Sequence, residues 1–82
     1  MGKCHDLKIL PQYFDDVVIG NKTFEIRKDD RNFKLKDYLN LREWNPDKEC
    51  YTGKHIIKQI CYITRYEQKE GYVVLGLRPY LW

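Results

Sequence analysis

Cysteine is scarce in this sequence, and the three cysteines are not spaced for a disulfide framework or a metal site. They are Cys4, Cys50 and Cys61, in a chain of 82 residues. An odd set without a close pair does not match a secreted disulfide framework. Zinc sites usually bring two ligands within a few residues of each other, and neither His5 nor His55 supplies that spacing. We therefore expect reduced thiols, no metal and no cofactor.

Long apolar runs and targeting signals are missing as well. No segment is long and apolar enough to cross a bilayer, and Met1–Asp6 is no secretory signal peptide. Gly2 lacks the Ser or Thr that a myristoylation motif places after it. These absences predict a cytoplasmic protein without a membrane partner.

Linkers, repeats and low-complexity tracts are also absent, which favours one small domain over residues 1–82. Hydrophobic residues make up 43% of the chain and aromatic residues 15%, enough for large buried areas in a small core. The net charge is only +3. That mildly basic balance is compatible with an anionic partner and does not require one.

The first part of the chain predicts a strand and a short helix. Residues Cys4–Ile9 alternate between polar and apolar side chains, as in a strand with one buried face. Pro11 suits the first turn of a helix. Phe14, Val17 and Val18 then follow at helical spacing, so we expect them to form a narrow stripe that faces the core.

The segment 20–27 is the centre of the sequence. Its glycine stands where the preceding helix would end, and the residues after it alternate like a strand. Phe24 and Ile26 are predicted to point into the core, which puts the charged residues of this strand on the opposite face. A lysine at the helix-to-strand turn can reach that face. The face would then hold three charged groups, Lys22, Glu25 and Arg27.

The rest of the chain predicts further strands. Residues 28–37 are predicted to form a charged loop, either a solvated connector or a mobile rim in which Lys28 and Arg31 contact a ligand. Strands are expected at 38–44, within 54–66 and at 72–78. The change of apolar parity in the middle one indicates a bulge or a strand buried on both faces. The sum is a mainly β (α+β) fold: a small barrel of about five strands, mostly antiparallel, capped by one short helix.

Four positions of the central segment match the Gly-x-Lys-x-x-Glu-x-Arg signature of the ASCH superfamily: Gly20, Lys22, Glu25 and Arg27. The order of elements is similar too, and His5–Ile9 and Cys50–Gly53 resemble a small, uncharacterised bacterial and phage branch. The resemblance implies a PUA-like β-barrel with a cleft where the signature strand meets the helix end. It also implies binding of RNA or another nucleic acid.

The chemistry of these side chains suits a small charged cleft for RNA or a nucleotide-like ligand. Lys22 and Arg27 only donate hydrogen bonds, which suits phosphate or a base carbonyl, and Glu25 can accept one from an exocyclic amine. Aromatic neighbours can stack on a base. The predicted ligand-binding residues are Lys22, Glu25, Arg27, His5, Lys8, Arg31, Trp44 and Tyr13.

Three other interpretations remain open. The charged groups of the central strand can simply pair with one another. The resemblance includes a branch that hydrolyses acetylated cytidine with a lysine, a threonine and a glutamate. Lys22 matches that lysine, Glu25 stands where the threonine would be, and the insertion that carries the glutamate is lacking. The enzymatic alternative is thus an amide hydrolase with Lys22 and Glu25 catalytic. The last alternative is a protein-binding module, encoded by a phage or its host.

Overall fold

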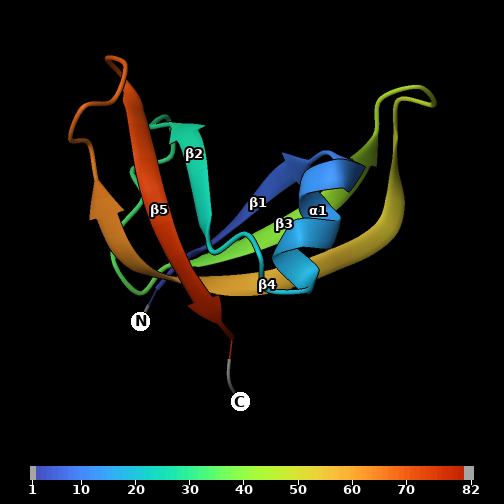
Figure 1. Cartoon of the computed structure of the whole chain (residues 1–82), viewed down its shortest axis with the longest axis horizontal. Helices are drawn as coiled ribbons and strands as arrows, with labels where there is room; N and C mark the ends of the chain where they lie inside the picture. Colours follow the sequence, from blue (N-terminus) through green and yellow to red (C-terminus); the bar gives the residue numbers. More distant parts are fainter. Residues whose placement is uncertain (1, 81–82) are drawn as a thin grey trace.

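A single strongly curled sheet with one helix beside it forms the fold (Figure 1). The computed structural model describes residues 2–80. The elements in chain order are β1 (Cys4–Ile9), α1 (Pro11–Val18), β2 (Phe24–Lys28), β3 (Tyr38–Asn45), β4 (Cys50–Thr64) and β5 (Tyr72–Pro79).

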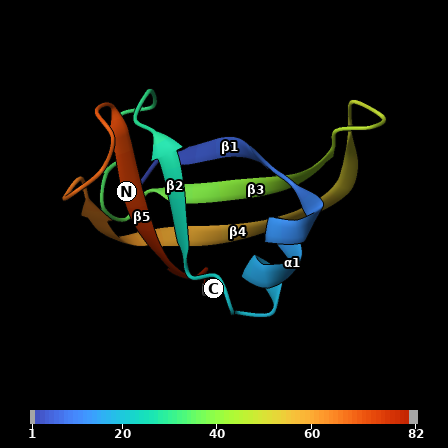
Figure 2. The ribbon, with the colours of Figure 1, turned by 45° about the horizontal axis from the view of Figure 1, so that its top comes forward.

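The sheet has the strand order β1-β3-β4-β5-β2, in which β1 pairs with β3 in parallel and every other pair is antiparallel. Strands β1, β3 and β4 run side by side, and β5 and β2 turn across them (Figure 2). The result is a half-barrel, open between its two edge strands β1 and β2. The prediction of a mainly β fold with about five strands and one short helix is confirmed.

The core occupies the concave side of the sheet, where alternate residues of the strands point. Every second residue is buried along β1, β3 and β5, as expected for strands with one buried face. The helix adds Phe14 and Val17, and the loop before β3 adds Phe33. The core residues are Leu7, Ile9, Phe14, Val17, Phe33, Leu39, Leu41, Ile60, Val73, Leu75 and Leu77.

Helix α1 is short and ends at the predicted glycine. Pro11 occupies its first turn, and Gly20, with φ of +89°, follows its last turn in the conformation that glycine adopts most readily. The prediction that Val18 faces the core is wrong, because Val18 is about half exposed. The two turns of this helix contact the core only through Phe14 and Val17.

Strand β4 is longer and more irregular than the other strands. Its pairing with β5 shifts between Ile60 and Tyr62, which confirms the predicted bulge. The predicted start of this strand, within 54–66, is too late, since β4 already begins at Cys50. The Asn45 side chain accepts hydrogen bonds from two amides of the turn, so a tight hairpin closes directly after β3.

The predicted cleft residue His5 lies on the core side, where it holds the chain start to the loop before β3. Its Nε2 lies 2.8 Å from Oδ2 of the buried Asp37, and its ring meets Phe33 edge-on. Asp37 also accepts hydrogen bonds from the Lys3 and Lys34 amides. Burial raises the pKa of the Asp37 carboxyl, but the His5 hydrogen bond and charge and the two amides outweigh it, so this pKa lies below its ordinary value.

We predict that Asp37→Asn lowers the free energy of unfolding at neutral pH by about 2–4 kcal/mol, because it leaves buried donors poorly paired. Since the folded-state pKa is depressed, the ionised carboxylate stabilises fully above its unfolded pKa of about 4. That contribution is lost as the pH falls through the folded-state value. Thermal unfolding across the acidic range should therefore show wild type and variant converging. Asp47→Asn, in the exposed hairpin turn, is the control. A constant gap down to the lowest pH would contradict the assignment.

Candidate functional site

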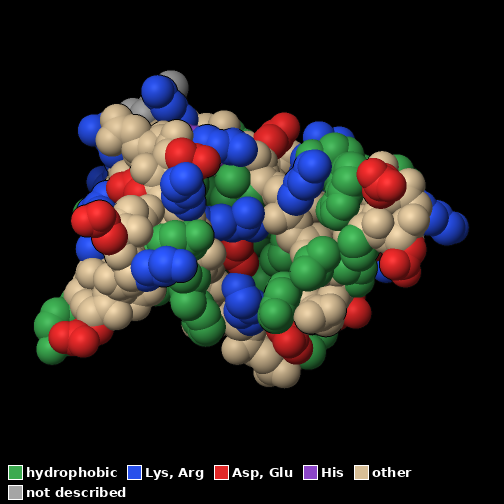
Figure 3. Space-filling model, turned by 90° about the horizontal axis from the view of Figure 1, so that it is seen from above, with side chains coloured by type: hydrophobic (Ala, Val, Ile, Leu, Met, Phe, Trp, Pro, Cys, Tyr) green, Lys and Arg blue, Asp and Glu red, His purple; other side chains and the backbone are tan. Residues whose placement is uncertain are grey.

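A cavity of about 490 Å³ lies where the end of β1, helix α1 and strand β2 meet. Figure 3 shows basic side chains gathered in the middle of this side of the molecule, with acidic atoms between them and hydrophobic side chains around them. The lining consists of Lys8, Ile9, Leu10, Tyr13, Lys22, Phe24, Glu25, Ile26 and Arg27.

Strand β2 turns toward the core the face opposite to the one predicted. Glu25 is only 4% exposed, whereas Phe24 is 41% and Ile26 52% exposed. Glu25 pairs across the ladder with Leu75, a core residue of β5, so it points to the concave side. The prediction of an apolar inner face on β2 is therefore wrong, because this edge strand turns its charged side inward.

The buried carboxylate of Glu25 is paired with a cation at each oxygen. Lys22 Nζ lies 2.5 Å from Oε1, and Arg27 Nε lies 2.9 Å from Oε2. Lys22 Nζ also donates to the Phe24 carbonyl at 2.7 Å. Because a buried carboxylate is tolerated only when it is well paired, these two cations make the inward orientation of Glu25 possible. We call Lys22, Glu25 and Arg27 the ion triad.

Two arginines span the opening between the sheet edges. Arg27 Nη2 donates to the Lys8 carbonyl at 2.6 Å, and Arg31 Nη1 donates to the Asp6 carbonyl at 2.8 Å. Asp6 and Lys8 lie two residues apart on β1, so these carbonyls point to the same edge. Side chains thus take the place of the backbone ladder that would close the barrel.

The ion triad does not use all of its hydrogen-bond donors. Among the described residues, hydrogen bonds engage two of the three Nζ protons of Lys22 and two of the five guanidinium N–H groups of Arg27. The charged side chains of the cavity lining are two cations, Lys22 and Arg27, and one anion, Glu25, because the Lys8 ammonium lies over Trp44. A ligand that offers acceptor oxygens or negative charge fits this donor set.

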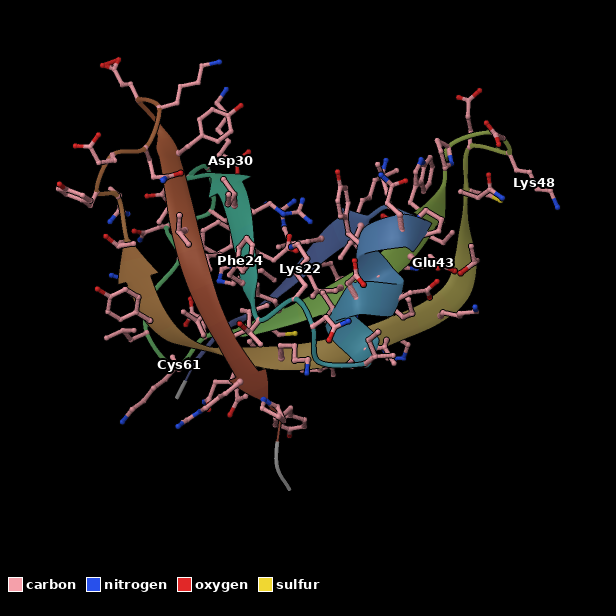
Figure 4. The ribbon with its side chains drawn as sticks, in the orientation of Figure 1. Lys22, Phe24, Asp30, Glu43, Lys48 and Cys61 are labelled. Atoms are coloured by element: carbon pink, nitrogen blue, oxygen red, sulfur yellow. The ribbon has the colours of Figure 1, made fainter. Side chains whose placement is uncertain are left out.

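Aromatic rings flank the amino group of Lys22, which Figure 4 shows between α1 and β2. Its Nζ lies 4.9 Å from the centre of the Phe24 ring and 5.8 Å from that of Tyr13. Both rings are partly exposed, one on β2 and one on α1. A ligand can therefore place a flat apolar group on these rings, beside a charged group that Lys22 binds.

The chain has clear relatives. A family described as "Domain of unknown function (DUF3850)" matches residues 4–77. This chain belongs to that family. An "Uncharacterized 12.9 kDa protein in GpA 3'region" of Escherichia phage P2 is 38% identical over 76 residues, which are 92% of this chain and 68% of the phage protein. The family match in this DUF3850 domain covers all five strands nearly completely, and the cavity entirely.

The structure of this DUF3850 domain brings together five of the eight predicted ligand-binding residues. Those that line the cavity are Lys8, Tyr13, Lys22, Glu25 and Arg27, and those that do not are His5, Arg31 and Trp44. The Lys8 ammonium lies over Trp44, with Nζ 3.9 Å from the centre of the Trp44 ring. Sequence analysis missed Phe24 and Ile26 as lining residues, since their alternation with charged neighbours had assigned them to the core.

Within residues 2–80, no group of three or more His, Cys, Asp or Glu side chains is arranged to hold a metal ion. No helix in the same range is long and apolar enough to span a membrane.

We predict that Glu25→Gln lowers the free energy of unfolding by roughly 2–4 kcal/mol, because a neutral amide can accept from one cation but directs its own N–H groups at the other. Urea unfolding measures the loss. Glu70→Gln, in the exposed β4–β5 loop, should change it little and serves as the matched control. Equal stability of both variants would mean that Glu25 is not held in the ion triad.

Proposed function

We propose that this domain binds a nucleotide-like ligand, and specifically one nucleotide of an RNA, in the cavity between α1, β1 and β2. The observation that carries the proposal is the placement of spare Lys22 and Arg27 donors beside the Tyr13 and Phe24 rings. Together they offer one position for an anion and one for a flat ring.

The charged side of the cavity suits phosphate or a base carbonyl. Within residues 2–80, Nη1 of Arg27 has no hydrogen-bond partner, whereas its Nε and Nη2 groups donate to Glu25 and to the Lys8 carbonyl. Charge-assisted hydrogen bonds to phosphate are the stronger class of hydrogen bond in proteins. Because Glu25 already accepts from two cations, its main role in this proposal is to orient the donors.

The apolar side of the cavity suits the base. Leu10, Tyr13, Phe24 and Ile26 are all substantially exposed at the lining, although they are large and hydrophobic. Stacking of a base on an aromatic side chain is worth about 1–3 kcal/mol.

The proposal includes the relation to the ASCH superfamily and its PUA-like barrels. The signature residues Lys22, Glu25 and Arg27 gather where the signature strand follows the helix end, which is where that resemblance expects a cleft. The expectation of a cytoplasmic RNA-binding protein is part of the same proposal.

The geometry favours binding over hydrolysis. A lysine acts as a base or nucleophile only when it is unprotonated. Here the Lys22 amino group donates to a carboxylate and a carbonyl at the same time, so both contacts engage the group that would have to react. Release of acetate from an acetylated cytidine would instead favour the hydrolase alternative.

The test is titration with the four ribonucleoside monophosphates, followed by backbone amide shifts. We expect the shifts to centre on the cavity, and Tyr13→Leu to weaken binding by about five- to 100-fold through the lost ring contact. Tyr13 lies outside the ion triad, so this variant leaves Glu25 paired. Tyr66→Leu, in the distant β4–β5 loop, is the matched control.

Arg27→Gln is expected to weaken binding by at least about tenfold, because a charge-assisted hydrogen bond contributes about 1.5–3 kcal/mol. Lys69→Gln removes a cation from the β4–β5 loop and should leave the affinity unchanged. Shifts scattered over the surface, or no shifts at millimolar nucleotide, would contradict the proposed site.

A further inference from the structure

Strand β1 separates the cavity from a second cluster of side chains on the outer face of the sheet. The carbonyls of Asp6 and Lys8 accept hydrogen bonds from Arg31 and Arg27 at the open edge. The side chains of Asp6 and Lys8 alternate with the buried residues of β1, so they lie on the outer face. The two sides of the molecule are therefore only one edge strand apart.

The outer-face cluster alternates cations with aromatic rings. Lys8 Nζ lies 3.9 Å from the Trp44 ring centre, and Trp44 meets Tyr51 edge-on at 5.0 Å. The Arg42 guanidinium lies 3.8 Å from the Tyr51 ring centre. Rings in this arrangement hold cations in place by cation–π attraction. Arg42 is also the register partner of Lys8. It lies on the neighbouring strand β3, and neighbouring strands are roughly 5 Å apart.

A shallow pocket of about 290 Å³ continues this cluster on β3 and β4. His55 Nδ1 lies 2.8 Å from Asn40 Oδ1, and the Asn40 amide donates to Asp6 Oδ1 at 3.1 Å. An amide oxygen only accepts, so Nδ1 of His55 donates to Asn40, and Nε2 can donate to a phosphate only when the imidazole is doubly protonated. Arg42 and Lys54 line the same pocket.

We infer that a single strand of RNA, with one nucleotide in the cavity, crosses the edge of β1 and places a backbone phosphate in the pocket of Arg42, Lys54 and His55. The inference rests on the proposed function and extends it from one nucleotide to a strand. Lys8 links the two sites, since it contacts Arg27 through its carbonyl and Trp44 through its ammonium.

The contacts of the outer face favour a phosphate backbone as the occupant. The rings there are already covered by Lys8 and Arg42, so the face presents charge rather than a stacking platform. On the outer face, Asp6 Oδ2 is 3.9 Å from Arg42 Nη1. Glu43 is buried on the core side of β3, where it accepts from the Thr52 hydroxyl and lies 4.0 Å from Lys54 Nζ. Both distances leave the cations able to bind a phosphate that comes closer.

The test compares uridine monophosphate with a uridine hexanucleotide at several salt concentrations. We expect the hexanucleotide to bind at least about tenfold more tightly and with a steeper salt dependence, because more phosphates are neutralised. Arg42→Gln should weaken only the hexanucleotide, by about three- to tenfold, and reduce its salt slope by about one. His55→Gln should act in the same direction, and Lys69→Gln is the charge-matched control. Unfolding temperatures verify that each variant is folded.

The outcomes separate the two proposals. If the monophosphate and the hexanucleotide bind with equal affinity and Arg42→Gln changes neither affinity, the inferred path of the RNA across β1 is wrong. The proposed nucleotide site in the cavity would still hold. Both proposals are supported if Arg27→Gln weakens the binding of both ligands, whereas Arg42→Gln removes only the tighter binding of the hexanucleotide. Both proposals are wrong if Arg27→Gln leaves the affinity for the hexanucleotide unchanged, or if neither ligand binds. If an acidic peptide binds at Arg42 and the hexanucleotide does not, RNA is not the ligand of this pocket, and the inference is wrong.

Discussion

The buried carboxylate of Glu25 is the constraint on which the rest of this structure depends. A charge on the concave side of a small sheet is costly, and it is retained here because Lys22 and Arg27 each bind one of its oxygens. These contacts fix the helix-to-strand turn against β2. They also place two cations, with donors to spare, at the wall of a cavity. Stability and a capacity for binding thus come from the same three side chains.

The open half-barrel follows from the same arrangement. An exposed strand edge invites pairing with other chains, and proteins protect such edges in several ways. On the β1 edge, Arg27 and Arg31 occupy the carbonyls of Lys8 and Asp6. The opening between β1 and β2 is therefore bridged by long side chains rather than by a backbone ladder. The cavity lies directly beside this bridge, lined partly by the residues that form it.

Much of the fold could be predicted from the sequence because β1, β3 and β5 each alternate polar with buried apolar residues. Strand β2 shows the limit of that signal. Alternation separates Phe24 and Ile26 from Glu25 and Arg27, but it does not say which pair points inward. That depends on the contact of Lys22 with Glu25, which local pattern does not reveal. Likewise, His5 shared the buried parity, but its partner Asp37 is 32 residues away and only the folded chain brings it close.

The most direct test of the account is a double-mutant cycle between Glu25 and Arg27, measured by the free energy of unfolding. The cycle compares Glu25→Gln, Arg27→Met and the double variant with wild type, and so isolates the interaction of the two side chains. If the ion triad holds the carboxylate inward, the coupling should be about 1–3 kcal/mol, as expected for contacting residues in one network. A coupling below about 0.5 kcal/mol would mean that the two residues act independently, and would contradict the account.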